Sequence, residues 1–289
     1  MTDTPVWVAL GAVPHTVRYL QVGPWHTRVL QAGDSGPHLV VMHGTGGQLE
    51  AYAHNIGPLA EHYRVTAFDF PGHGYTTHAT SDLELTSYVE HLRGLLDALG
   101  IDVAHLNGES LGGWVAVKFA AAHPERTGRL ILNTPGGTMA RPEVMERIRS
   151  LSQAAADDPS DEHIRARLEW LMADPATVTE ELVAIRQTIY ARPGFAGSMR
   201  HILCLQDPGV RRRNLVTDAE LAAVPHGAMV IWTSNDPSGP AAAGMDMAEK
   251  IPHGQFEYLA AAGHWPQWEQ RELFNRLVLG FLAQSHASR

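Results

Sequence analysis

The chain of 289 residues contains a single cysteine, Cys204, which excludes an internal disulfide. No run of about 18 apolar residues is present to cross a bilayer, and the first twenty residues lack the basic start and long apolar core of a signal peptide. The 17 histidines show no spacing that is typical of a metal site. We therefore expect a cytoplasmic protein with no membrane span, no structural disulfide and no bound metal.

Positive charge is also scarce, since 22 Lys and Arg face 31 Asp and Glu and the formal net charge is −9. A negative overall field argues against nucleic acid and anionic membranes as partners. The hydrophobic fraction of 44% is ordinary for a globular protein, and the chain is long enough to bury a large core. The composition therefore indicates a globular protein and argues against these two kinds of partner.

Short apolar runs rich in β-branched residues predict buried strands. These runs lie at 17–22, 27–31, 38–42, 65–70, 103–107, 130–133, 228–233 and 256–259. Helical patterns alternate with the later runs, at 86–99, 111–122 and 267–282. The alternation predicts an α/β protein with a mostly parallel eight-stranded sheet and helices on both faces. Because only Gly-Pro joins the first two runs, we expect these two strands to be antiparallel.

The alternation stops between about 136 and 225, where no run predicts a strand. Helix-like segments follow one another there, at 142–156, 161–172, 178–191 and 195–206. Asp-Pro and Arg-Pro-Gly steps separate them, as is typical of helix ends. Such an insertion covers the carboxyl edge of a sheet, where open α/β sheets bind ligands. We expect residues 1–135 and 226–289 to form the core and residues 136–225 to form a helical cap, or lid.

The stretch Gly108-Glu109-Ser110-Leu111-Gly112 matches G-x-S-x-G and lies between a predicted strand and a predicted helix. In this turn, called a nucleophile elbow, the flanking positions leave no room for side chains and the serine is held in a strained backbone conformation. Serine needs a base and an orienting acid to become a nucleophile. Asp236 and His264 follow in loops after the last two predicted strands, in the order Ser, Asp, His. We expect these three residues to be a catalytic triad.

Each member of this triad has an ordinary alternative explanation. Ser110 could cap a glycine-rich helix start, Asp236 could be a turn residue before proline, and His264 could be one of many loop histidines. The three residues in the required order, each at the end of a predicted strand, favour catalysis over these alternatives.

A glycine-rich loop, His43-Gly44-Thr45-Gly46-Gly47, follows the third predicted strand. Its glycines allow the backbone to approach a substrate closely. We expect the backbone N–H groups of Thr45 and Leu111 to form an oxyanion hole, and we expect Gly44 and Gly46 to contact the substrate. His43 precedes the turn, so we expect it to anchor the loop.

These features are similar to those of the α/β-hydrolases. The match includes the H-G-x-G loop, D-F-P-G-H-G at 69–74, the elbow, H-P-E-R at 123–126 and a late G-H, and thus covers nearly the whole chain. Within that superfamily the chain most resembles the meta-cleavage-product hydrolases, serine hydrolases that cut carbon–carbon bonds in aromatic hydrocarbon catabolism. The stretches that carry this resemblance are 54–65, 124–137, 179–189 and 263–282.

The resemblance implies an α/β-hydrolase fold and cleavage of a 2-hydroxy-6-oxohexa-2,4-dienoate-type substrate. It implies that Arg186 holds the substrate carboxylate and that Trp265, next to the catalytic histidine, also contacts the substrate. His264 would first help to convert the dienol to a ketone, and Ser110 or an activated water would then attack the remote carbonyl. The resemblance implies no metal or organic cofactor, and it allows a homodimer.

Glu109 departs from the family pattern, because the family usually has asparagine there, which helps to bind the enol end of the substrate. A carboxylate beside Ser110 repels an anionic substrate unless a cation pairs with it or it is protonated. Glu109 is therefore a candidate substrate-binding residue whose role is open, and it could also point away from the site. A carboxylesterase or lactonase for a neutral ester is the alternative function, and a receptor without turnover is a third.

Apolar residues of the predicted cap are candidates for the underside of the lid, although residues at this spacing are more often core. They are Trp170, Leu171, Met172, Met199 and Ile202.

Overall fold

The computed structural model describes residues 4–224 and 226–284 of the chain. Pro225, where the cap is expected to end, and residues 1–3 and 285–289 of the expected core lie outside the described residues. The strands are β1 (His15–Val22), β2 (Trp25–Ala32), β3 (His38–Met42), β4 (Arg64–Phe68), β5 (Ala104–Glu109), β6 (Thr127–Asn133), β7 (Ala228–Thr233) and β8 (Gly254–Leu259).

The α-helices are α1 (Val6–Gly11), α2 (Ala53–Ala60), α3 (Leu85–Leu99), α4 (Leu111–Ala122), α5 (Pro142–Asp157), α6 (Asp161–Glu169), α7 (Glu180–Tyr190), α8 (Phe195–Ile202), α9 (Pro208–Asn214), α10 (Asp218–Ala222), α11 (Ala241–Lys250), α12 (Pro266–Glu269) and α13 (Arg271–Ala283). Short 3₁₀ helices are η1 (Leu49–Tyr52), η2 (Pro124–Arg126), η3 (Pro175–Thr177) and η4 (Leu203–Gln206).

The strands form one eight-stranded sheet in the order β1-β2-β4-β3-β5-β6-β7-β8. β2 is antiparallel to both β1 and β4, and the remaining pairs are parallel. Both the mostly parallel sheet and the antiparallel entry pair expected from the sequence are confirmed. Every residue of β7 is buried, because helices cover both faces of a parallel sheet, and this explains why such strands appear as continuous apolar runs.

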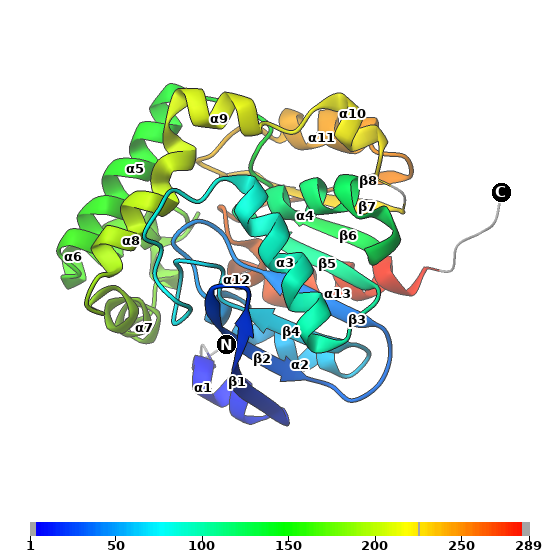
Figure 1. Ribbon diagram of the computed structural model, residues 1–289, viewed down its shortest axis with the longest axis horizontal. Coiled ribbons are helices and arrows are strands. Elements are labelled where there is room, and N and C mark those ends of the chain that lie inside the picture. The colour runs from blue at the N-terminus through cyan, green and yellow to red at the C-terminus, as the bar shows by residue number, and fades with distance from the viewer. Residues whose placement is uncertain (1–3, 225, 285–289) are drawn as a thin grey trace.

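Helices lie on both faces of this sheet (Figure 1). On one face, neighbouring helices pack against each other in the order α3, α4, α10 and α11. A second group of helices that pack together consists of α2, α12 and α13. Between β6 and β7 the described residues form helices and no strand, and α5 to α9 gather beside one end of the sheet in Figure 1. None of the helices in the described part of the chain is both long and apolar enough to cross a membrane.

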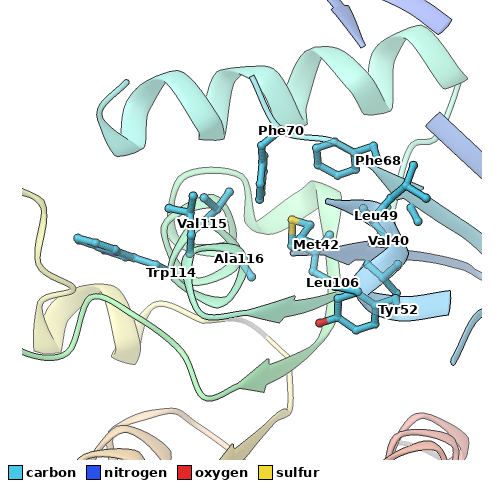
Figure 2. Packing of buried hydrophobic residues seen from close by; sticks show 14 of the residues in the cluster. Val40, Met42, Leu49, Tyr52, Phe68, Phe70, Leu106, Trp114, Val115 and Ala116 are labelled. Atoms are coloured by element: carbon cyan, nitrogen blue, oxygen red, sulfur yellow. The ribbon is translucent and has the colours of Figure 1, made fainter. Parts of the chain in front are cut away.

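The core beneath the elbow is packed from β3, β5 and α4. Met42, Leu106 and Val115 are fully buried there, and Figure 2 shows them between the sheet and the helix. A Cβ at Gly112 would lie 2.4 Å from the carbonyl oxygen of Met42, so only glycine allows α4 to approach β3 this closely. Trp114 points away from this cluster and donates its indole N–H to the carbonyl of Asn214, on the far side of the helix.

The sequence pattern was wrong about the last helix and did not reveal several others. The helix expected over 267–282 is broken at Gln270, which has non-helical dihedral angles (φ −123°, ψ 40°). We attribute the break to Glu269, whose carboxylate accepts hydrogen bonds from the backbone N–H groups of Gly263 and Ala173, outside the helix. The missed helices are α1, α2, α9, α10 and α11.

A buried ion cluster fixes the loops around the elbow. Arg28 of β2 donates to Asp69 (Nε–Oδ2, 2.7 Å) and to both carboxylate oxygens of Glu50 (2.8 Å each). Asp69 also accepts the backbone N–H groups of Leu49 and Tyr75. Burial alone would lower the pKa of Arg28, but the two carboxylates outweigh it and raise that pKa. The guanidinium thus joins β2, the segment after the glycine-rich loop and the D-F-P-G-H-G turn.

Replacing Arg28 tests this cluster. Arg28→Met leaves the carboxylates of Asp69 and Glu50 buried without a cation, so we expect the free energy of unfolding to fall by about 3–5 kcal/mol. Urea denaturation followed by circular dichroism measures it. Arg93→Met removes an exposed arginine that also pairs with two carboxylates, and we expect a loss of about 0–1 kcal/mol. Equal losses in the two variants would contradict a structural role for the cluster.

Candidate active site

The elbow is built by close approach of backbone to backbone. β5 ends at Glu109, α4 begins at Leu111, and Ser110 between them has φ 52° and ψ −108°, which is rare for a residue with a side chain. A Cβ at Gly108 would lie 2.2 Å from backbone atoms of Gly112. The strand therefore turns into the helix without space for side chains at positions 108 and 112, as the motif predicted.

His264 and Asp236 lie in the loops after β8 and β7, and the fold brings them together. The Nδ1 atom of His264 is 2.8 Å from Oδ1 of Asp236, and both side chains are buried. The backbone of His264 is held from two sides. Its N–H donates to the carbonyl of Leu171 (2.6 Å), and its carbonyl accepts from the hydroxyl of Thr134 (2.9 Å). The aspartate can therefore orient the imidazole and fix its Nδ1–H tautomer.

The other ring nitrogen of His264 faces Glu109 rather than Ser110. Its Nε2 lies 3.2 Å from Oε1 of Glu109, a carboxylate that is only 1% exposed. Burial raises the pKa of Glu109 to about 7, against the positive charges of His264 and Arg167, which lower it. Burial also acts to lower the pKa of His264, but the carboxylates of Asp236 and Glu109 raise it above its ordinary value. The imidazole thus lies between two carboxyl groups.

One cavity connects most of the candidate site residues. Its wall includes Gly44, Thr45, Glu109, Ser110, Leu111, His264 and Trp265. Asp236, Gly46 and Arg186 are not part of this wall. Of the five apolar cap candidates, Trp170 and Leu171 line the cavity. Met172, Met199 and Ile202 are buried instead in the hydrophobic core, as residues at helical spacing commonly are.

The glycine-rich loop is held by His43, as its place before the turn suggested. Nδ1 of His43 contacts the carbonyl of Gly44 (2.8 Å), and Nε2 accepts the backbone N–H of Phe70 (3.1 Å). Burial lowers the pKa of His43 to about 4, which keeps the ring neutral for these two contacts. The N–H of Leu111 is in the first turn of α4, where helix geometry provides no partner for it.

Arg186 of α7 is a buried cation that no described carboxylate pairs with. Its Nη1 donates to the carbonyl of Gly46 (2.6 Å), an oxygen that also accepts from the hydroxyl of Tyr190 (2.9 Å). Its guanidinium lies over the ring of Trp265, 5.8 Å from the centroid. Nε and Nη2 have no hydrogen-bond partner among the described residues. A buried guanidinium with two free nitrogens can bind an anion such as a carboxylate.

Sequence reasoning missed a second cation, Arg167 of α6, which is 4% exposed and lines the cavity. A signal was present, since Arg167 shares one helix face with the buried Ile164, Leu168 and Leu171, at the spacing of an apolar stripe. A charged residue at such a position is buried and needs a partner. In the described part of the chain, no three His, Cys, Asp or Glu side chains group closely enough to hold a metal ion.

The chain matches the family model described as alpha/beta hydrolase fold over residues 37–270, which confirms the expected fold class. It is 34% identical over 264 residues to a 2-hydroxy-6-oxo-6-phenylhexa-2,4-dienoate hydrolase of Burkholderia cepacia, covering 88% of this chain and 90% of the relative. It is 34% identical to a 2-hydroxy-6-oxononadienedioate/2-hydroxy-6-oxononatrienedioate hydrolase of Paraburkholderia phymatum, covering 85% and 87%. A solved meta-cleavage product hydrolase variant from Pseudomonas fluorescens superimposes with a TM-score of 0.80 at 28% identity, covering 93% and 97%.

The contact between Glu109 and His264 has a consequence for pH dependence. Glu109→Gln removes one of the carboxylates that raise the pKa of His264, and a base must be neutral to accept a proton. We therefore expect the acid limb of kcat/KM to move to lower pH, measured with a neutral p-nitrophenyl ester. Glu90→Gln, at an exposed glutamate of α3 paired with Arg93, is the control and should leave the limb in place. An unchanged limb in Glu109→Gln would mean that Glu109 does not act on His264.

Proposed function

Because the chain belongs to the α/β-hydrolase fold family and, within it, to the meta-cleavage-product hydrolases, we propose that it cleaves the carbon–carbon bond of a 2-hydroxy-6-oxohexa-2,4-dienoate-type ring-cleavage product. The observation that carries the proposal is Arg186, a buried cation without a carboxylate partner, whose ring neighbour Trp265 is on the cavity wall with Ser110. A neutral ester has no need of such a cation, whereas the C1 carboxylate of a dienoate does.

In the proposed mechanism Ser110, His264 and Asp236 form the triad. His264 first removes the proton of the 2-hydroxyl and delivers it to C5, so that the dienol becomes a 2-ketone and His264 is neutral again. His264 then takes the hydroxyl proton of Ser110, directly or through a water, and the oxygen adds to the C6 carbonyl. The backbone N–H groups of Thr45 and Leu111 stabilise the resulting oxyanion. Asp236 keeps the imidazole oriented through its 2.8 Å contact.

Cleavage then breaks the C5–C6 bond. The electron pair moves through C4 and C3 onto the C2 oxygen, and protonation of that oxygen gives a 2-hydroxypenta-2,4-dienoate. The C6 fragment is left as an acyl ester on Ser110, and water releases it as a carboxylic acid. If an activated water attacks in place of Ser110, the same bonds break and the acid forms directly. The chemistry is complete without a metal or an organic cofactor.

The same proposal assigns the two parts of the chain and the residues that surround the substrate. Residues 136–225 are the cap that selects the substrate, and residues 1–135 and 226–289 are the catalytic core. Gly44, Gly46 and Trp265 surround the substrate, with Arg186 on its carboxylate. We also propose a cytoplasmic location, which suits a chain whose single cysteine is Cys204, and a homodimer, which the family resemblance suggests.

Glu109 favours a second candidate function. A carboxyl group on the cavity wall, 3.2 Å from the base, opposes an anionic substrate when it is ionised. A carboxylesterase or lactonase for a small neutral ester would not meet that repulsion. The two functions use the same triad, so only the relative rates on the two substrate classes separate them.

The first measurement compares turnover of a dienoate substrate with turnover of a neutral ester. We expect the purified protein to bleach yellow 2-hydroxy-6-oxo-6-phenylhexa-2,4-dienoate with a far higher kcat/KM than it shows on a short-chain p-nitrophenyl ester. Ser110→Ala should lose about 10³-fold or more in kcat on both, since the nucleophile is gone. Ser150→Ala, on the exposed side of the cap helix α5, should leave both rates unchanged. Turnover of the ester alone would establish the second candidate instead.

Arg186 is tested by charge removal. Arg186→Met should raise KM for the dienoate by about 10- to 100-fold, as expected for the loss of a hydrogen bond to a charged group worth about 1.5–3 kcal/mol. KM for the neutral ester should change little. Arg200→Met removes an exposed arginine from the neighbouring cap helix α8 and should affect neither substrate. A similar rise for the ester would assign Arg186 to holding the loop at Gly46 rather than to the substrate.

A further inference from the structure

Arg167 is a second buried cation above the nucleophile, and the steps described above do not use it. Its Nε donates to the hydroxyl of Ser152 (2.8 Å), and its guanidinium lies 5.4 Å from the ring centroid of Trp170. Its Nη1 is buried and has no partner among the described residues. No described carboxylate lies within ion-pair distance of it. A buried guanidinium in this state is costly unless an anion joins it during the working cycle.

The positive charge of Arg167 affects the pKa values of Glu109 and His264. Burial, together with the neighbouring cation Arg186, lowers the pKa of Arg167 to about 10, and the opposing effects of Tyr190 and Glu109 are smaller. In the other direction, its positive charge lowers the pKa values of both Glu109 and His264. Two arginines from two helices, α6 and α7, therefore lie close enough for the charge of one to lower the pKa of the other.

The proposed reaction creates two negative oxygens in different places. The first is on C6, when Ser110 adds to the carbonyl, and the N–H groups of Thr45 and Leu111 serve it. The second is on C2, when the electron pair of the broken C5–C6 bond arrives there. Since C2 is bonded to the carboxylate carbon, its oxygen lies beside the group that Arg186 binds. Glu109, the wall residue next to Ser110, is a carboxyl and opposes that charge when it is ionised.

The other arginines of the cavity wall are already engaged. Arg141 pairs with Glu143 (2.8 Å). Arg211 donates to the carbonyl of Met139 (2.7 Å) and lies over the ring of Trp114. Neither has a buried nitrogen without a partner, whereas Nη1 of Arg167 does. Arg167 is thus the cavity cation with a free, desolvated donor.

We propose that Arg167 binds the C2 oxygen of the substrate and stabilises the negative charge that this oxygen acquires when the carbon–carbon bond breaks. This inference rests on the proposed function and adds a catalytic residue to it. A cation preorganised in a water-poor cavity gains most from charge that develops in the transition state. The role is specific to carbon–carbon cleavage, because ester hydrolysis places its leaving charge on the alcohol or phenol oxygen.

The test compares two substrates in Arg167→Met. With yellow 2-hydroxy-6-oxo-6-phenylhexa-2,4-dienoate we expect kcat to fall about 10²- to 10³-fold, the loss typical of removing one oxyanion donor, with a smaller change in KM. With p-nitrophenyl acetate we expect kcat to stay within a few-fold of wild type. Arg167→Lys should recover part of the dienoate rate, since it keeps the charge but not the planar donor group.

A matched control lies two residues earlier on the same helix. Arg165 is paired with Asp161 at the outer side of α6, and Arg165→Met should leave both substrates unaffected. If Arg167→Met does not fold, as judged by circular dichroism, Arg167→Gln makes the same comparison. It keeps a hydrogen-bond donor for Ser152 without the charge.

The outcomes separate this inference from the proposed function. An equal fall on both substrates would make Arg167 a structural residue and overturn the inference. A rise in KM for the dienoate with unchanged kcat would also overturn it, because Arg167 would then only bind the ground state. If the wild-type protein does not cleave the dienoate at all, the proposed function fails and the inference fails with it. Loss of kcat on the dienoate alone supports both.

Discussion

The close contact between the glycines of the elbow and the strands beneath it is the constraint on which the site depends. Gly112 touches the carbonyl of Met42, and Gly108 touches the backbone of Gly112, so α4 lies directly on β3 and β5. This contact places Ser110 at the carboxyl edge of the sheet in a conformation that a free chain would avoid. The surroundings hold it there, because its N–H donates to the carbonyl of Asn133 and its own carbonyl accepts the N–H of Gly136. The strain is thus maintained by β6 and by the loop that follows it.

Charge balance is the second property of the site, and it explains how a buried glutamate is tolerated beside Ser110. Glu109 is buried, but it faces His264 and lies within the field of Arg167. Its raised pKa, about 7, means that the carboxyl takes or gives up a proton near neutrality. The pocket can therefore reduce its own negative charge when an anionic substrate enters, since a second anion favours the protonated form. An asparagine at position 109 has no ionisable group, so it could not change the charge of the pocket in this way.

The parts of the site that follow from local patterns were predictable, and those that depend on side-chain packing were not. The runs at 38–42 and 228–233 coincide with β3 and β7, because buried parallel strands are apolar throughout. The approach of His264 to Asp236 followed from chain order and strand ends. Nothing in the order of residues tells which way Glu109 points, because that depends on its contact with the glycine-rich loop at Gly44. The sequence pattern also did not predict helix α2. Its sequence contains Gly57 and Pro58, and its stability comes from packing on α13.

The segment that follows α6 and the loop that carries His264 are held together by the carboxylate of Glu269, which belongs to none of the sequence motifs. Glu269 of α12 accepts the N–H of Gly263 with one oxygen and the N–H of Ala173 with the other. The backbone of the next residue, His264, donates in turn to the carbonyl of Leu171. The segment 171–173 continues directly from α6, which carries Arg167. These hydrogen bonds limit the movement of His264 relative to Leu171 and Ala173, which directly follow α6, the helix that carries Arg167. Under the proposed function, a substrate that contacts both Arg167 and His264 meets two groups whose positions are already set. Preorganised catalysis requires such an arrangement.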